Sequence, residues 1–119
     1  MKIIRLKEIE KQFRPDGRTV QKLLQQELSR EFSSWQFLYV VHPPKLKEDL
    51  HSHNKSYEAL YFLDGARYKI NGVDYDINNG DMVIFEPGDI HGAIPVDNEV
   101  RLFVIQAPAI TDDKKLYKP

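Results

Sequence analysis

The hydrophobic pattern from Trp35 onward is that of short β-strands. The run "WQFLYVV" is aromatic and β-branched, and it ends at Pro43-Pro44, which cannot continue a hydrogen-bonded ladder. Five more such runs follow, separated by turn residues: "YEALYFL", "ARYKI", "VDYDI", "DMVIF" and "EVRLFVIQAP". Short strands with a turn about every eight to twelve residues predict a sandwich or a barrel, so we expect an all-β fold.

The segment 67–76 gives the clearest local prediction. Asn71-Gly72 between two alternating runs is the strongest short signal for a β-hairpin with a two-residue loop. The register of such a hairpin places Tyr68 opposite Tyr75 on an apolar face. The other face then carries two pairs of opposite charge, Arg67 with Asp76 and Lys69 with Asp74. We therefore expect the two basic residues to be surface cross-strand partners rather than substrate ligands.

The first 34 residues carry a mixed pattern. "RPDGR" has the residue order of a tight turn. "TVQKLLQQEL" has apolar residues at helical spacing and could equally form an outer strand. We favour a strand for 18–24, because almost everything downstream is strand. The segment 1–34 is thus expected to add an outer strand or a short irregular or helical piece to a barrel core at 35–108, with 109–119 as a tail.

The run from Tyr57 to Leu63 is apolar on both of its faces. Alternation along a strand puts Glu58, Leu60 and Phe62 on one side and Tyr57, Ala59, Tyr61 and Leu63 on the other. That pattern suits a strand buried on both sides. A small barrel has little chain with which to cover its own outside, so a homodimer interface over these strands is the simplest explanation. The N-terminal segment is the competing cover.

Composition narrows the class of protein. At 119 residues the chain fits one domain, 1–119. Seventeen basic and eighteen acidic side chains leave no basic excess for binding nucleic acid. The chain has no cysteine, which excludes disulfides, thiolate catalysis and sulfur-ligated metals. The N-terminus has no apolar signal block, and the longest purely apolar stretch, "FLYVV", is too short to span a membrane. We expect a soluble cytoplasmic protein.

The stretch "HSHNKSYEALYFLDG" at 51–65 carries the candidate chemistry. Strand alternation puts His51 and His53 on one face, where two imidazoles can converge on one ion. Glu58 can enter from the next strand, and His91 follows a Pro-Gly turn. An unpaired buried carboxylate costs several kcal/mol, so an inward Glu58 implies a neutralising cation or proton. Three imidazoles and one carboxylate suit one divalent transition metal per chain, namely Fe, Mn, Ni, Cu or Zn.

These residues resemble the two motifs of the cupin superfamily, in its small single-domain form with a conserved barrel. The pattern H-x-H-x4-E-x6-G, at 51–65, is similar to the first motif, and G-x6-P-G-x2-H, at 80–91, is similar to the second. The resemblance covers about Trp35 to Pro108 and implies a double-stranded β-helix, or jelly-roll barrel, that is often dimeric. It also implies four metal ligands: His51, His53, Glu58 and His91.

The chain departs from the family pattern at three positions. Lys45 stands where a glycine usually opens the first motif, Glu86 where a proline usually starts the turn of the second, and Pro95 where an asparagine is often found. No ligand is removed, so the differences concern turn shape and the rim of the pocket. Glu86 either points to solvent, which we favour, or reaches the pocket as a second acid/base group. His42 has no matching context and is expected at the surface.

Cupins include dioxygenases, sugar isomerases, decarboxylases, lyases, storage proteins and sensor modules, so the resemblance does not determine the activity. We expect a metal-dependent enzyme acting on a small sugar-like or oxo-acid molecule, by isomerase or lyase chemistry or with dioxygen. Inward-facing Phe62, Tyr68 and Tyr75 would shape the pocket, and the two tyrosine hydroxyls could bond the substrate. The alternative is a non-catalytic protein that binds a small molecule or metal, because the sequence shows no cationic clamp and no general base beyond the ligands.

Overall fold

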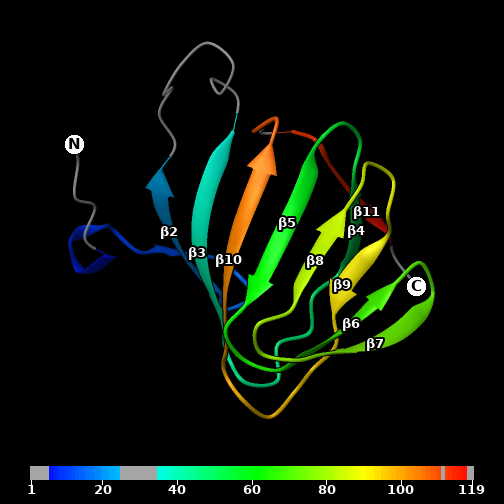
Figure 1. Cartoon of the computed structure of the whole chain (residues 1–119), viewed down its shortest axis with the longest axis horizontal. Coiled ribbons are helices and arrows are strands. Elements are labelled where there is room, and N and C mark those ends of the chain that lie inside the picture. The colour runs from blue at the N-terminus through cyan, green and yellow to red at the C-terminus, as the bar shows by residue number, and fades with distance from the viewer. Residues whose placement is uncertain (1–5, 25–34, 111, 118–119) are drawn as a thin grey trace.

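The computed structural model describes residues 6–24, 35–110 and 112–117, which form two antiparallel β-sheets facing each other (Figure 1). One turn of 3-10 helix, η1 (Leu6–Glu8), is the only helix in these ranges, and none of them holds a helix long and apolar enough to cross a membrane. The all-β prediction is confirmed.

Strands from distant parts of the chain alternate within each sheet. The six-stranded sheet runs in the order β1 (Gln12–Phe13), β2 (Thr19–Leu24), β3 (Gln36–His42), β10 (Val100–Ala107), β5 (Tyr57–Phe62) and β8 (Met82–Phe85). The five-stranded sheet runs in the order β11 (Lys114–Tyr117), β4 (Leu50–His53), β9 (His91–Ala93), β6 (Ala66–Ile70) and β7 (Val73–Ile77). Because the chain passes repeatedly from one sheet to the other, the architecture is the double-stranded β-helix that the motifs implied.

Strand β2 resolves the mixed N-terminal pattern. It pairs with β3, with Thr19 opposite Val41 and Val20 opposite Val40, and Val20 is buried in the core. The strand that we favoured is therefore confirmed for 19–24, and the helical alternative is wrong there. The remainder of that pattern, at 25–34, lies outside the described residues.

The β6–β7 hairpin forms in the expected register. Asn71 and Gly72 both have positive φ, at 49° and 82°, as a two-residue loop of this kind requires. The two charge pairs form at the surface, with nitrogen–oxygen distances of 2.8 Å for Arg67–Asp76 and 2.9 Å for Lys69–Asp74.

The apolar face of this hairpin is only half buried, which corrects one expectation. Tyr68 is 2% exposed, whereas Tyr75 opposite it is 47% exposed. The difference arises because β7 is the edge strand of its sheet. Tyr75 therefore does not shape an internal pocket.

The core lies between the two sheets. Strand β5 alternates as predicted, with Leu60 and Phe62 buried and Tyr57 and Tyr61 exposed on the outer face. Its partner strands contribute in the same manner, and the largest buried apolar side chains of the core include Leu38, Val40, Phe62, Tyr68, Phe85, Leu102 and Val104.

The C-terminal residues that we expected to form a tail contribute strand β11. It pairs with β4, so that Lys114 lies opposite His53 and Leu116 opposite His51. Its sequence, "KKLY", carries no alternation of its own; the pairing depends on the exposed edge that β4 offers.

Lys45 has a backbone conformation that favours glycine. Its φ is +63°, in the left-handed region that costs a non-glycine residue roughly 1–2 kcal/mol. Its N–H donates to the Val96 carbonyl at 2.6 Å, which ties the entry of the first motif to the loop after β9.

Candidate metal centre

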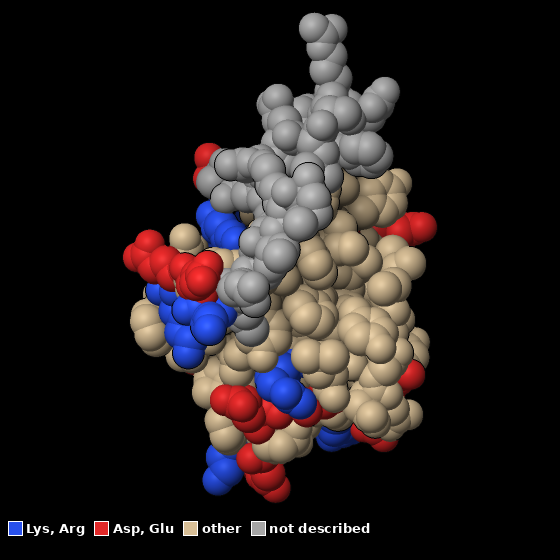
Figure 2. All heavy atoms as spheres, turned by 60° about the vertical axis from the view of Figure 1, so that its left-hand side comes forward, with Lys and Arg blue, Asp and Glu red and all other residues tan. Residues whose placement is uncertain are grey.

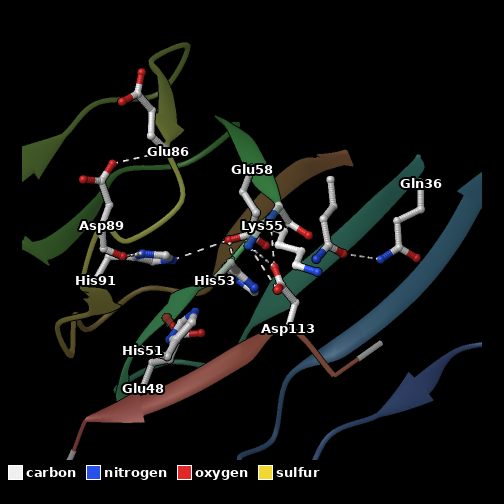
Figure 3. A network of polar contacts seen from close by, with 12 residues as sticks. Gln36, Glu48, His51, His53, Lys55, Glu58, Glu86, Asp89, His91 and Asp113 are labelled. Atoms are coloured by element: carbon white, nitrogen blue, oxygen red, sulfur yellow. Dashed lines mark hydrogen bonds and ion pairs between the residues drawn. The ribbon is translucent and has the colours of Figure 1, made fainter. Parts of the chain in front are cut away.

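The structure brings the four predicted ligands into one cluster. His51 and His53 lie on β4, His91 on β9 and Glu58 on β5, and one candidate ligand atom from each lies within 4.8 Å of all the others (Figure 3). His51 and His91 are direct cross-strand partners. Glu58 comes from the other sheet, so the cluster joins the two sheets across the inside of the barrel.

Two of the imidazoles are oriented by backbone carbonyls. The Nδ1 atoms of His51 and His91 each lie 3.0 Å from a carbonyl oxygen two residues earlier, that of Asp49 and that of Asp89. An Nδ1–H that donates to a carbonyl leaves Nε2 with a free lone pair, which is the form that binds a metal. The His91 ring also stacks on Phe85 at 3.7 Å between centroids, nearly parallel at 5°.

Charge in the cluster is arranged for a cation. Burial alone would raise the pKa of Glu58, but its contacts with His53 and His91 lower it, so the carboxylate is ionised. Burial, together with neighbouring His91, lowers the pKa of His51 to about 3, which keeps that imidazole neutral. A neutral imidazole beside an ionised carboxylate is the protonation state that metal ligation needs.

The contacts among these groups fit a shared ion better than hydrogen bonds. Glu58 Oε1 lies 3.1 Å from His53 Nε2 and 3.4 Å from His91 Nε2. Yet both ring nitrogens of His53 are buried and make no hydrogen bond of acceptable geometry with the described part of the chain. Buried polar atoms without partners are rare and usually reflect a missing ion or water. Three nitrogen donors and one oxygen could hold one metal ion, and they do not identify it.

A buried aspartate supports the loop between His53 and Glu58. Asp113, 4% exposed, accepts hydrogen bonds from the backbone N–H groups of Lys55 at 2.8 Å and Ser56 at 2.7 Å (Figure 3). Burial opposes its ionisation, but these two donors lower the pKa of Asp113. No local pattern in the sequence points to Asp113, because its link to the loop depends on β11 lying against β4.

The cluster borders an internal cavity of about 380 Å³. All four candidate ligands line it, and so does Tyr68. Burial raises the pKa of Tyr68 well above its usual value, so its hydroxyl stays protonated. Its ring packs edge-to-face against Phe62, which is fully buried and supports Tyr68. A cavity of this size suits a small molecule, since such sites measure roughly 300–1,000 Å³.

Two candidate residues lie away from this cavity. Tyr75 is exposed on the edge strand, and Glu86 is exposed in the turn before His91, pointing away from the cluster in Figure 3. The Glu86 backbone N–H donates to Asp89 Oδ2 at 2.8 Å, so Asp89 closes this turn. The prediction that Glu86 points to solvent agrees with this placement.

His42, which we expected at the surface, is buried at 5% exposure. It follows Leu38 and Val40 on the inward side of β3, so strand parity could have revealed its position. Burial lowers the pKa of His42 to about 4. The cavity wall also includes four basic residues whose convergence the sequence did not reveal: Arg14, Arg18, Lys22 and Lys114.

The chain belongs to the cupin domain family, whose model matches residues 37–106. No curated protein matches it. Among solved structures, it is similar to a predicted oxalate decarboxylase from Thermotoga maritima, with 22% identity over 88% of this chain and 97% of that one and a TM-score of 0.74. It is also similar to a polyketide cyclase from Streptomyces resistomycificus, with 15% identity over 100% of this chain and 87% of that one and a TM-score of 0.79. A third similar structure is ectoine synthase from P. lautus, with 16% identity over 99% of this chain and 91% of that one and a TM-score of 0.76. At these identities the likeness establishes the fold alone.

Metal content tests the cluster directly. We expect purified wild-type protein to carry close to one transition-metal ion per chain, measured by elemental analysis. His51→Ala and His91→Ala should each lose most of it, because each removes one of the four donors. His42→Gln is the matched control, since it alters a buried histidine outside the cluster and should leave the metal content unchanged. Equal metal in all four proteins would contradict the assignment.

Asp113 offers a test of the supporting loop. Asp113→Ala should weaken metal affinity by about 10–100-fold, because residues that orient metal ligands typically have effects of this size. The measurement is a competition titration with a chelator, and Asp112→Ala, at the exposed neighbouring position, is the control. Wild-type affinity in Asp113→Ala would show that the loop holds its shape without this carboxylate.

Proposed function

We propose that this chain is a small metal-dependent enzyme that acts on a sugar-like or oxo-acid molecule by proton transfer, as isomerases and lyases do. The observation that carries the proposal is the placement of the His₃Glu cluster on the wall of a cavity that fits a small molecule. A bound divalent metal would supply Lewis-acid polarisation of substrate oxygens.

Tyr68 supports proton transfer as the type of chemistry. It lies on β6, is almost fully buried, and borders the same cavity as the candidate ligands. Burial raises its pKa, so the phenol stays protonated and its hydroxyl can donate a hydrogen bond to a substrate oxygen. We therefore assign Tyr68 the role of a hydrogen-bond donor that stabilises negative charge developing on a substrate oxygen.

The structural neighbours agree with an enzyme but do not select a reaction. They are described as a predicted decarboxylase, a cyclase and a synthase, three different activities on one fold. The alternatives are dioxygen chemistry at the same cluster and ligand binding without turnover, and both are outcomes of the experiment below.

We further propose a homodimer formed through the outer face of the six-stranded sheet. Four large apolar side chains on β5, β8 and β10 are exposed there: Tyr61, Met82, Ile84 and Ile105. Figure 2 shows a broad, mostly uncharged surface over this sheet, with charged residues gathered toward its margins. Exposed apolar patches of this kind usually mark interfaces, and twofold dimers are the commonest assembly.

Tyr68 and Tyr75 lie opposite each other in the β6–β7 hairpin and allow a matched test of activity. Metal-loaded protein is screened with sugars and oxo-acids in D₂O under anaerobic conditions. A substrate should gain deuterium at a carbon position, which ¹H NMR detects as the loss of a proton signal. Tyr68→Phe should keep its metal and lower this rate by about 10²–10³-fold, since that is the usual cost of removing one hydrogen-bond donor to a developing oxyanion. Tyr75→Phe removes a hydroxyl from the exposed partner position and should keep the wild-type rate.

Other outcomes point to other functions. Turnover that requires and consumes oxygen would replace proton transfer by dioxygenase chemistry. Thermal stabilisation by a compound without any turnover would indicate a binding protein. Equal rates in the two phenylalanine variants would remove Tyr68 from the mechanism.

The mass of the protein in solution tests the proposed dimer. Light scattering after size-exclusion chromatography should give twice the mass of the 13.9 kDa chain. Ile84→Glu places a charge on the exposed face and should shift the protein toward the monomer. Val73→Glu alters an exposed apolar side chain on β7, in the other sheet, and should leave the dimer intact. A wild-type monomer would contradict the proposed dimer.

A further inference from the structure

A second polar cluster lines the same cavity, with members next to both sheets. His42 at the end of β3 and Arg18 just before β2 border the cavity, as does Glu48, which precedes β4. The three histidines of the metal centre lie on the five-stranded sheet, whereas His42 belongs to the six-stranded one. Arg18, His42 and Glu48 do not belong to the set of candidate metal ligands.

His42 is the unusual member of this cluster. It is 95% buried, being only 5% exposed, and its imidazole makes no side-chain hydrogen bond with any residue that the structure describes. Burial lowers its pKa to about 4, so the ring is neutral at physiological pH and offers one N–H donor and one nitrogen acceptor. A buried polar group that faces a cavity without a protein partner is normally satisfied by water or a ligand.

The charged neighbours of His42, in contrast, are already paired. Arg18 Nη1 lies 2.7 Å from Glu48 Oε2, and Arg18 Nε lies 2.8 Å from Asp16 Oδ2. The second oxygen of Glu48 accepts the backbone N–H of Ala93 at 3.0 Å. Counting Asp16, Arg18 and Glu48, the cluster has one positive and two negative charges, so its formal charge is −1.

This arrangement selects among ligand groups. A carboxylate or phosphate would approach Glu48 against like charge, with Arg18 already engaged by two carboxylates. An apolar group would leave the His42 imidazole buried without a partner, which is unfavourable. A hydroxyl group both donates and accepts, and therefore matches the neutral imidazole.

We propose that His42 hydrogen-bonds a hydroxyl group on the part of the ligand that lies away from the metal centre. The ligand class is then an acid with a hydroxylated tail, whose oxygen-bearing head faces the metal centre and whose tail reaches the second cluster. This inference rests on the proposed function, because the metal centre would hold the head. His42 thereby acts as a specificity-determining residue.

The test compares two acids that share a metal-chelating head. D-gluconate and 2-hydroxyhexanoate both carry a 2-hydroxy acid on a six-carbon chain, but only gluconate has hydroxyl groups along its tail. Isothermal titration of the zinc-loaded protein should show about tenfold tighter binding of gluconate, as one or two hydrogen bonds would give. In ¹⁵N spectra of histidine-labelled protein, the His42 ring signals should shift with gluconate and not with 2-hydroxyhexanoate.

Variants of His42 make the assignment specific. His42→Phe should lose the preference for gluconate while keeping its affinity for 2-hydroxyhexanoate, and His42→Gln, which restores a donor and an acceptor, should regain part of it. Unchanged metal content and melting temperature in both variants verify the fold. Equal affinity of the two acids for wild type, a preference that persists in His42→Phe, or no binding of either acid would each overturn the proposal.

These outcomes differ from failure of the proposed function. Lack of zinc binding would remove the metal centre, and lack of turnover in the substrate screen would remove the enzyme, whereas the gluconate preference is read from equilibrium binding alone. Gluconate preference and its loss in His42→Phe can hold in a protein that catalyses nothing.

Discussion

An ionised carboxylate inside the barrel is the constraint on which the rest of this structure depends. Glu58 faces inward on a strand whose other inward residues, Leu60 and Phe62, are buried and apolar. Isolating such a charge from water is costly unless positive charge or hydrogen bonds compensate. Here His53 and His91 approach it from the opposite sheet, at 3.1 and 3.4 Å. The two sheets are thus joined at the point where a cation would sit, and a cavity lies beside that point.

The remaining parts of the site serve to hold these groups in place. Backbone carbonyls orient two of the imidazoles, and Phe85 fixes the plane of the His91 ring. Asp113, from the segment next to β11, fixes the loop that separates His53 from Glu58. Without these hydrogen bonds, the polar loop between His53 and Glu58 would have fewer contacts to keep the two residues in place. Precise placement of ligands by neighbouring hydrogen bonds is a general requirement of metal sites.

The cavity walls differ in chemical character, and this difference organises the proposed chemistry. One sheet contributes the three histidines and Tyr68, whose hydroxyl remains protonated. The other contributes Glu58 and, at a separate position, His42, which remains neutral because it is buried. In the cluster around Glu48 and Arg18, the guanidinium is already paired with two carboxylates. Under the proposed function, a ligand would be recognised by hydrogen bonding at that cluster and by its oxygen atoms at the metal centre.

Local sequence determined the elements that depend on neighbours along the chain. The Asn71-Gly72 turn, the strand parity of β5 and the spacing of His51, His53, Glu58 and His91 were all readable, because strand alternation and turn chemistry act over a few residues. The exposure of Tyr75, the burial of His42 and the role of Asp113 were decided only by tertiary structure. An edge position, a cavity wall and a strand added from the C-terminus all depend on which distant segments pack together. Residue type and spacing thus specify what a strand presents on each face, and the packing of the two sheets decides what that face meets.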